Sequence, residues 1–111
     1  MNDILKDVEV LKQKVMNSNE YNDFKKYEQI LDSNKEVNDI INKIKKLQQQ
    51  IINKEDKNEN VDKEQIELET LYKKLDTYTD YTNYINASKK LNEMITNIQK
   101  EFEKYFNKFI I

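Results

Sequence analysis

Apolar residues recur every three or four positions along nearly the whole chain, the spacing that gathers them on one face of an α-helix. No stretch of four or more residues alternates apolar and polar side chains as a half-buried strand would. Four polar interruptions divide the pattern, at Ser18, 32–34, 53–60 and 77–80. The pattern therefore predicts an all-α fold of about five helices.

Each interruption carries polar side chains that can begin the next helix. Ser18 can cap a helix whose first turn contains Glu20, where the helix dipole favours negative charge. At the other three breaks we expect a paired cap, formed by Ser33 with Glu36, Asp62 with Gln65, and Thr77 with Asp80. Because the chain has no Gly or Pro, these caps are the local signals that separate its helices.

The two central helices are predicted to form a hairpin. Residues 53–60 contain no apolar side chain and lie at the middle of the chain, so we expect them to form its polar tip loop. The helix on each side of the loop bears an apolar stripe of the type found in helical bundles. The two stripes consist of Val37, Ile40, Ile44, Leu47 and Ile51, and of Leu68, Leu71, Tyr72 and Leu75.

The last helix has the strongest pattern. Its stripe keeps the spacing of a coiled coil over four heptads, and only Ser88 in it is polar. The stripe consists of Tyr81, Tyr84, Ser88, Leu91, Ile95, Ile98, Phe102, Tyr105 and Phe109. A helix over residues 80–108 would be about 44 Å long, whereas a compact chain of this length has a radius of gyration of roughly 13 Å. A spherical monomer cannot cover such a stripe.

We therefore expect residues 1–111 to form a single domain, an elongated antiparallel helical hairpin or bundle. The stripe of the last helix is expected to be completed by a second subunit, and a homodimer is the simplest assembly. The expected seam consists of Tyr84, Leu91, Ile95, Ile98, Phe102 and Tyr105, with Val37, Ile40, Ile44 and Leu47 packed opposite.

The composition removes most catalytic chemistry. The chain has no Gly, Pro, Cys, His or Trp, and all 19 basic residues are Lys. Phosphate loops need Gly, while zinc sites, iron–sulfur clusters and activated nucleophiles of the Ser-His type need Cys or His. The neighbouring Glu64, Glu67 and Glu69 could suggest a di-metal site, but such bundles also use His, so we interpret them as a solvated acidic face. We expect no catalytic, cofactor-binding or metal-binding residue and no small-molecule substrate.

Charge gives little support to nucleic-acid binding. Lysine pairs recur along the chain, but they are interleaved with Asp and Glu, and the net charge is −2. No Arg is present for bidentate contacts to phosphate or guanine, so a solvated surface is the favoured interpretation. No apolar run reaches the roughly 18 residues of a membrane span, and the charged first residues do not fit a signal peptide. We expect a cytoplasmic protein.

The C-terminal stretch is the most apolar part of the chain and allows three interpretations. It can close the bundle or dimer, dock a helix of another protein, or lie on a membrane surface. Closing the bundle is favoured, and partner docking comes next. The stretch consists of Phe102, Tyr105, Phe106, Phe109, Ile110 and Ile111, with Lys100, Lys104 and Lys108 on one face.

Three segments carry a family resemblance. They are S-N-E-Y-N-D-F-K-K at residues 18–26, N-K-E-V at 34–37 and I-N-K-I-K-K-L-Q-Q-Q at 41–50. With the hydrophilic central loop and the Tyr-Thr-Asn-Tyr opening of the last helix, they resemble the YlbF/YmcA family of small helical bacterial regulators. The resemblance covers roughly residues 4–105, and the third segment looks closest to the YmcA branch.

The resemblance implies a regulator without catalytic residues. Members of the family act with a third protein, YaaT, in a complex that modulates ribonuclease Y and so affects transcript maturation, competence, sporulation and biofilm formation. The partners it implies are a second copy or a sister family protein, within a ribonuclease Y complex. Some members hold iron–sulfur clusters through Cys, but this sequence has no Cys, so no cofactor is carried over.

Two other functions stay open. The chain could be a structural coiled-coil oligomerisation module with no regulatory role. A binder of RNA or of a membrane surface is the third and least favoured interpretation, because the chain has no basic excess to concentrate on one face.

Overall fold

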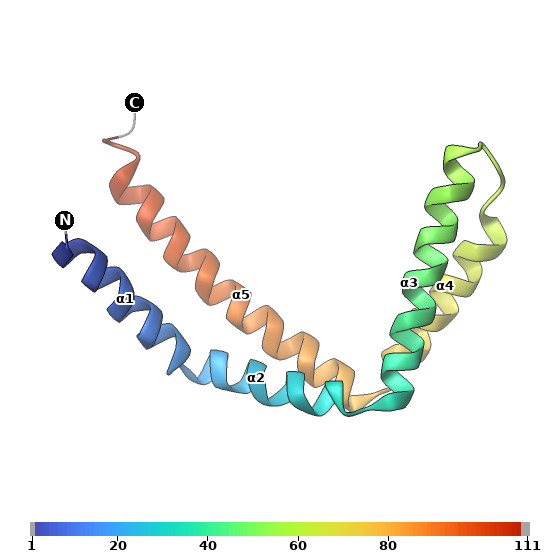
Figure 1. The fold of residues 1–111 in the computed structure, drawn as a ribbon, viewed down its shortest axis with the longest axis horizontal. Coiled ribbons are helices and arrows are strands. Elements are labelled where there is room, and N and C mark those ends of the chain that lie inside the picture. The colour runs from blue at the N-terminus through green and yellow to red at the C-terminus, as the bar shows by residue number, and fades with distance from the viewer. Residues whose placement is uncertain (1, 110–111) are drawn as a thin grey trace. The chain divides into compact units, whose positions relative to one another are not determined.

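The computed structural model describes residues 2–109 and contains five helices in that range (Figure 1). The helices are α1 (Asn2–Met16), α2 (Asn19–Asp32), α3 (Lys35–Asp56), α4 (Asp62–Leu75) and α5 (Thr79–Phe106). The all-α fold and the five helices predicted from the apolar spacing are confirmed. The long last helix is confirmed as well, because α5 spans 28 residues.

The chain divides into two compact units, and each is described by itself. Residues 2–28 and 84–109 form unit 1, and residues 29–83 form unit 2. Helices α2 and α5 each contribute residues to both units. The single domain and the elongated shape expected from the sequence stay predictions.

Unit 2 is built around the hairpin of α3 and α4, which pack along each other (Figure 1). Four of the five residues of the α3 stripe are covered: Val37 is 0% exposed, Ile40, Ile44 and Leu47 are also buried, and Ile51 is half-buried. Leu75 at the end of α4 is 2% exposed. Each large apolar side chain buried in this way stabilises the fold by about 1.5–3 kcal/mol. The predicted hairpin is therefore confirmed, with a core of its own.

The tip loop of the hairpin is shorter than predicted. Helix α3 continues to Asp56, so residues 53–56 are helical and the connection spans only residues 57–61. Polar composition does not stop a helix, and Gln49 Nε2 donates a hydrogen bond of 3.1 Å to Asn53 Oδ1 in the last turns. The turn is made at Asn58, whose φ of 58° lies in the left-handed region. Asn tolerates that region better than most residues, so no Gly is needed there.

Of the four predicted helix caps, one is confirmed. Ser18 Oγ accepts a hydrogen bond of 3.1 Å from the Tyr21 amide at the start of α2. The cap of α3 lies one residue later than predicted, because Asn34 Oδ1, and not Ser33, accepts from the Val37 amide at 3.1 Å. Ser33 Oγ instead donates to the Gln29 carbonyl at 3.2 Å.

The predicted caps of the last two helices are wrong. Asp62 is already the first residue of α4, and its amide donates to Asn60 Oδ1 at 2.8 Å, so Asn60 supplies the side-chain oxygen. Thr77 Oγ1 donates to the Lys74 carbonyl at 2.6 Å and so serves the end of α4 instead of the start of α5. Asp80 is engaged by Asn34 Nδ2 at 3.0 Å. Asn34 thus makes a tertiary hydrogen bond in addition to its cap, whereas the bonds of Ser18, Asn60 and Thr77 are local.

Unit 1 contains α1, the first part of α2, and α5 from Tyr84 onward. Only Ala87 and Leu91 are buried among the described residues of this unit. The rings of Phe24 and Tyr84 lie against each other with centroids 5.5 Å apart. Beyond Leu91 the apolar stripe of α5 is mostly uncovered, and so is the apolar face of α1. The exposed large side chains of unit 1 are Ile4, Leu5, Val8, Val10, Met16, Ile95, Phe102, Tyr105, Phe106 and Phe109.

Candidate functional site

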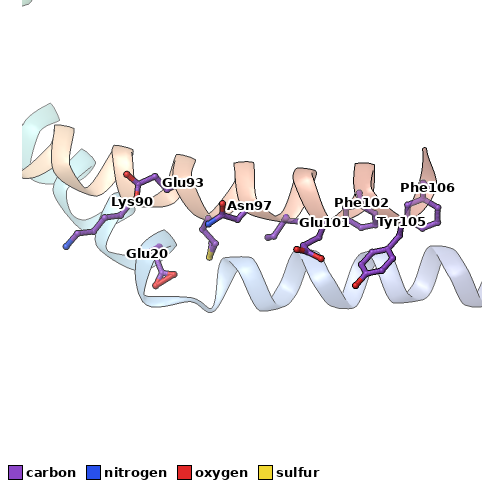
Figure 2. A pocket seen from close by; sticks show the side chains of 10 residues that line it. Glu20, Lys90, Glu93, Asn97, Glu101, Phe102, Tyr105 and Phe106 are labelled. Carbon is purple, nitrogen blue, oxygen red and sulfur yellow. The ribbon is translucent and has the colours of Figure 1, made fainter. Parts of the chain in front are cut away.

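Two apolar grooves follow α5 within unit 1. The first, here called the acid-rimmed groove, has a volume of about 780 Å³ and a floor of Met94, Ile98, Phe102, Tyr105 and Phe106. Its rim is polar and is formed by Glu20, Lys90, Glu93, Asn97 and Glu101. Figure 2 shows the lining side chains on α5, with Glu101 and Tyr105 directed toward the segment that faces α5 and Glu20 on that segment.

The second groove lies between α1 and α5 and is here called the α1–α5 groove. Its walls are almost entirely apolar, and Lys12 is its single charged lining residue among those described. The α1 side and the beginning of α2 contribute Val8, Leu11, Val15, Met16 and Tyr21, and the α5 side contributes Ile95, Ile98 and Phe102. Ile98 and Phe102 line both grooves, so the same part of the α5 stripe serves the two surfaces.

The floor of the acid-rimmed groove follows from a second periodicity in the sequence. Met94, Ile98, Phe102 and Phe106 are spaced by four, and residues four apart lie above one another on a helix. The rings of Phe102 and Phe106 stack with centroids 5.6 Å apart and an interplanar angle of 19°. Lys104 Nζ lies 5.5 Å from the centroid of the Tyr105 ring, at cation–π distance. The aromatic rings therefore form a continuous surface without being buried.

The structure brings only part of the predicted seam together. Ile95, Ile98, Phe102 and Tyr105 line the grooves, whereas Leu91 is buried and Tyr84 packs on Phe24. Ile95 is 37% exposed and Tyr105 58% exposed in the single chain. The second set, Val37, Ile40, Ile44 and Leu47, belongs to unit 2, where α3 packs along α4. That this set packs opposite the α5 set stays a prediction.

Sequence reasoning missed several groove residues. It overlooked Met94 and the rim formed by Glu20, Lys90, Glu93 and Glu101, and it did not assign Phe106 to a surface shared with Ile98. The row spaced by four from Met94 to Phe106 was the available signal for the floor. The contribution of Glu20 depends on the packing of α2 near α5, which no local pattern encodes.

The carboxylates of the proposed acidic face have separate environments. Glu64 is 9% exposed and forms an ion pair with Lys54 across the hairpin, whereas Glu67 and Glu69 are exposed. The hydrogen bond from Lys54 lowers the pKa of Glu64 and raises the pKa of Lys54. Within residues 2–109, no group of three or more Asp, Glu, His or Cys side chains could hold a metal ion. Glu64 is thus a structural residue of the hairpin.

A second polar contact joins the two ends of unit 2. Tyr78 Oη donates a hydrogen bond of 3.1 Å to Glu36 Oε2, which raises the pKa of Tyr78. Asn34, which caps α3, also donates to Asp80, and Asn38 Nδ2 donates to the carbonyls of Leu31, Asp32 and Asn34 at 2.9–3.2 Å. These bonds fix the junction of α2 with α3 and do not form a reactive site.

The recurring lysine pairs are exposed, and their interpretation as a solvated surface instead of a nucleic-acid contact stays a prediction. Lys25, Lys26, Lys45, Lys46, Lys73, Lys74, Lys89 and Lys90 are all exposed. Lys100, Lys104 and Lys108 are exposed near the C-terminus, where Ile110 and Ile111 lie outside the described residues. The described part of the chain has no helix that is both long and apolar enough to cross a membrane.

Comparison with known proteins identifies the family. Comparison with individual curated proteins gave no match. The family model described as "Control of competence regulator ComK, YlbF/YmcA" matches residues 4–105, which is nearly the whole chain and includes both grooves up to Tyr105. The chain therefore belongs to the YlbF/YmcA family of control-of-competence regulators.

Proposed function

We propose that this chain is a non-catalytic adaptor that acts through protein–protein contacts of unit 1, as part of a complex that modulates ribonuclease Y-dependent RNA processing. Membership in a family of competence regulators supports the regulatory role. The similarity of residues 41–50 to the YmcA branch supports placing the chain in that branch. In this proposal the complex forms in the cytoplasm.

The observation that carries the proposal is the uncovered apolar surface of unit 1. Aromatic and aliphatic side chains on one helix face, such as Phe102 at 43% and Tyr105 at 58% exposure, are costly to leave in water. Contiguous apolar surface of this kind marks protein–protein contact sites on soluble domains. Unit 2 buries Val37, Ile40, Ile44 and Leu47 of its α3 stripe. Among the described residues, its exposed large apolar side chains are Ile30, Ile52, Ile66 and Tyr72, against ten in unit 1, so the contact function is assigned to unit 1.

The assembly we propose uses the α1–α5 groove, including the part of the α5 seam that lines it. A second copy of the chain, or a sister family protein, would cover Ile95, Ile98 and Phe102 with its own helical stripe. The low charge of this groove favours such pairing, because Lys12 is its single charged lining residue within residues 2–109.

The proposal is tested by deleting the gene for this chain in its native cell and measuring the maturation of polycistronic transcripts. We expect unprocessed transcripts to accumulate, and a tagged wild-type chain to restore processing and to co-purify with ribonuclease Y or sister family members. Ile95→Asp should abolish both, whereas Ile66→Asp, on the 66% exposed position of α4, should not. Normal transcript maturation in the deletion strain would contradict the proposal.

A structural oligomerisation module is the second candidate, and the long regular stripe of α5 favours it. This candidate predicts that the tagged chain recovers only copies of itself and that its deletion leaves transcripts unchanged. The deletion experiment therefore separates the two candidates directly.

A further inference from the structure

We infer that the acid-rimmed groove binds a basic amphipathic helix of a different protein, while the α1–α5 groove serves assembly between family members. This inference rests on the proposed adaptor function and deepens it by assigning a surface and a partner chemistry. The observations that carry it are the length of the groove, the nature of its walls and the charge of its rim.

The dimensions and openness of the groove fit a helix. Its α5 residues extend from Lys90 to Phe106, a distance of about 24 Å at the rise of an α-helix, which matches an occupant of about 16 residues. The floor residue Tyr105 is more than half exposed in the single chain. Small-molecule sites instead enclose most of the ligand surface, so an open groove of this length is a poor small-molecule site.

The walls exclude an extended strand as the occupant. All ten lining residues lie on helices, nine on α5 and Glu20 on α2, and helices satisfy nearly all their backbone amides and carbonyls internally. An extended peptide lying here would find no backbone partners for its own amides and carbonyls. A helix brings a backbone that is already hydrogen bonded, and its side chains at i, i+3, i+4 and i+7 can contact the row from Met94 to Phe106.

The rim selects the charge of the occupant. Among the lining residues, Glu20, Glu93 and Glu101 stand against a single cation, Lys90, so the rim carries a net charge of −2. Lys104 does not line the groove, but its ammonium lies 5.5 Å from the ring of the floor residue Tyr105. None of the three carboxylates has an ion-pair partner among residues 2–109. They are therefore available to Lys or Arg side chains that flank the apolar face of a docked helix, which strengthens binding and speeds encounter.

The same charge argues against a second copy as the occupant. A symmetric pair would bring two rims of net charge −2 together, which is unfavourable. The helices of this chain also lack the required basic excess. Helix α1 has three Lys against three acidic residues, and α5 has four against four. Helix α3 has five Lys against four acidic residues, but its apolar face is already buried in unit 2.

The test uses two synthetic 18-residue helical peptides with the same Leu stripe, one flanked by Lys and the other by Glu, titrated into the full chain by fluorescence anisotropy. We expect the Lys peptide to bind about tenfold more tightly or better, with a preference that shrinks as salt screens the rim. Glu93→Lys with Glu101→Lys should reverse the preference. Both residues are exposed, so these changes should leave the helix content unchanged by circular dichroism.

Two matched variants separate a local effect from a general one. Glu67→Lys with Glu69→Lys makes the same charge change on the exposed surface of α4 and should leave the preference intact. Glu93→Gln with Glu101→Gln should reduce the preference without reversing it. Equal binding of the two peptides to the wild-type chain, or equal effects of the groove and α4 variants, would overturn the inference. A dimer that dissociates on Phe106→Glu while neither peptide binds would assign the groove to a second copy and also overturn it.

These outcomes are separate from those of the proposed function. If peptide selectivity is absent while deletion of the chain still blocks transcript maturation, the groove assignment fails and the adaptor function stands. If selectivity is present but deletion leaves transcripts unchanged, the adaptor function in RNA processing fails. If both hold, Glu93→Lys with Glu101→Lys should impair transcript maturation in cells, and the α4 variant should not.

Discussion

The two units of this chain differ in how far they bury their apolar stripes. In unit 2 the α3 stripe is buried from Val37 to Leu47 and half-buried at Ile51, and Val37 and Leu75 are almost completely removed from water. In unit 1, Leu91 is the one described residue of the longer α5 stripe that is buried, and large side chains of α1 and α5 stay exposed. The sequence pattern is as regular in the second stripe as in the first, so pattern strength does not reveal whether one chain supplies the cover.

The contrast separates a unit that buries an apolar core of its own from a unit that leaves most of its apolar stripe exposed. Marginal stability leaves little room for uncovered apolar surface, since a domain is stabilised by only about 5–15 kcal/mol in total. A chain that keeps such a surface on a regular helix face gains a binding site at the expense of some stability. We therefore expect substitutions in unit 2 to act on folding and those in unit 1 to act on association.

The largest difference in unfolding free energy is expected when a Val is replaced by Asp, once in each unit. Val37→Asp places a charge where the side chain is 0% exposed and should destabilise the fold by about 3–5 kcal/mol. Val8→Asp, at a position 52% exposed, should change the stability of the dilute chain by no more than about 0.5 kcal/mol. Urea unfolding followed by circular dichroism measures both. Equal losses would remove the distinction between the units.

The next largest effect concerns assembly. Ile95→Asp should weaken association by about 2 kcal/mol or more, which lowers the association constant roughly 30-fold. The carboxylate introduced at position 95 would be buried without a partner when the two chains associate. Ile66→Asp, on the exposed side of α4, should leave the association constant unchanged. Sedimentation equilibrium over a range of protein concentrations measures this constant. The seam assignment is wrong if the two variants associate alike.

A smaller effect is expected at the junction of α2 and α3. Asn34→Ala removes the cap of α3 and the hydrogen bond to Asp80, and should cost about 1–2 kcal/mol in unfolding free energy. The neighbouring Ser33→Ala should cost no more than about 0.5 kcal/mol, because Ser33 does not cap the helix. Chemical denaturation of both variants checks the corrected cap, and a larger loss for Ser33→Ala would restore the cap predicted from the sequence.

The smallest effect is the pH dependence of the hairpin ion pair. The pKa of Glu64 is lowered from 4.5 in the folded chain, so the pair stabilises the fold above about pH 4.5 and loses this contribution as the pH falls through the lowered pKa. The pKa of Lys54 is raised from 10.5, so its contribution is complete below about pH 10.5 and is lost as the pH rises through the raised pKa.

Thermal melts across the acid range test this ion pair. In Glu64→Gln the melting temperature should fall less steeply with falling pH than in the wild type. Glu67→Gln, at an exposed position, should follow the wild-type curve. Identical acid limbs for the wild type and Glu64→Gln would show that the pair contributes nothing measurable.

Much of the fold could be predicted because helix existence is encoded locally. The spacing of Ile40, Ile44 and Leu47 and the length of the α5 stripe appear directly in the sequence, and the structure confirms both helices. The helix ends were predicted less well, because several neighbouring polar residues could serve as caps. The contact of Asn34 with Asp80, 46 residues away, shows how a tertiary partner selects one of them.

The candidate site could be predicted only in part. The α5 stripe was visible, but its division between two grooves depends on where α1 and the start of α2 lie within unit 1. The acidic rim was not visible either, since Glu20 and Glu93 are 73 positions apart and meet only through packing. Periodicity shows which face of a helix is apolar, but it does not show what covers that face.

In the proposed assembly, another protein chain covers the apolar surface of unit 1. The most direct measurement places a photoreactive amino acid at Ile95 in one strain and at Ile66 in another, irradiates native cells, and identifies cross-linked adducts by mass spectrometry. Exposure alone would favour Ile66, which is 66% exposed against 37% for Ile95. We expect a specific adduct with a second copy or a sister family protein from position 95 and none from position 66. Equal labelling at the two positions, or no adduct at position 95, would contradict it.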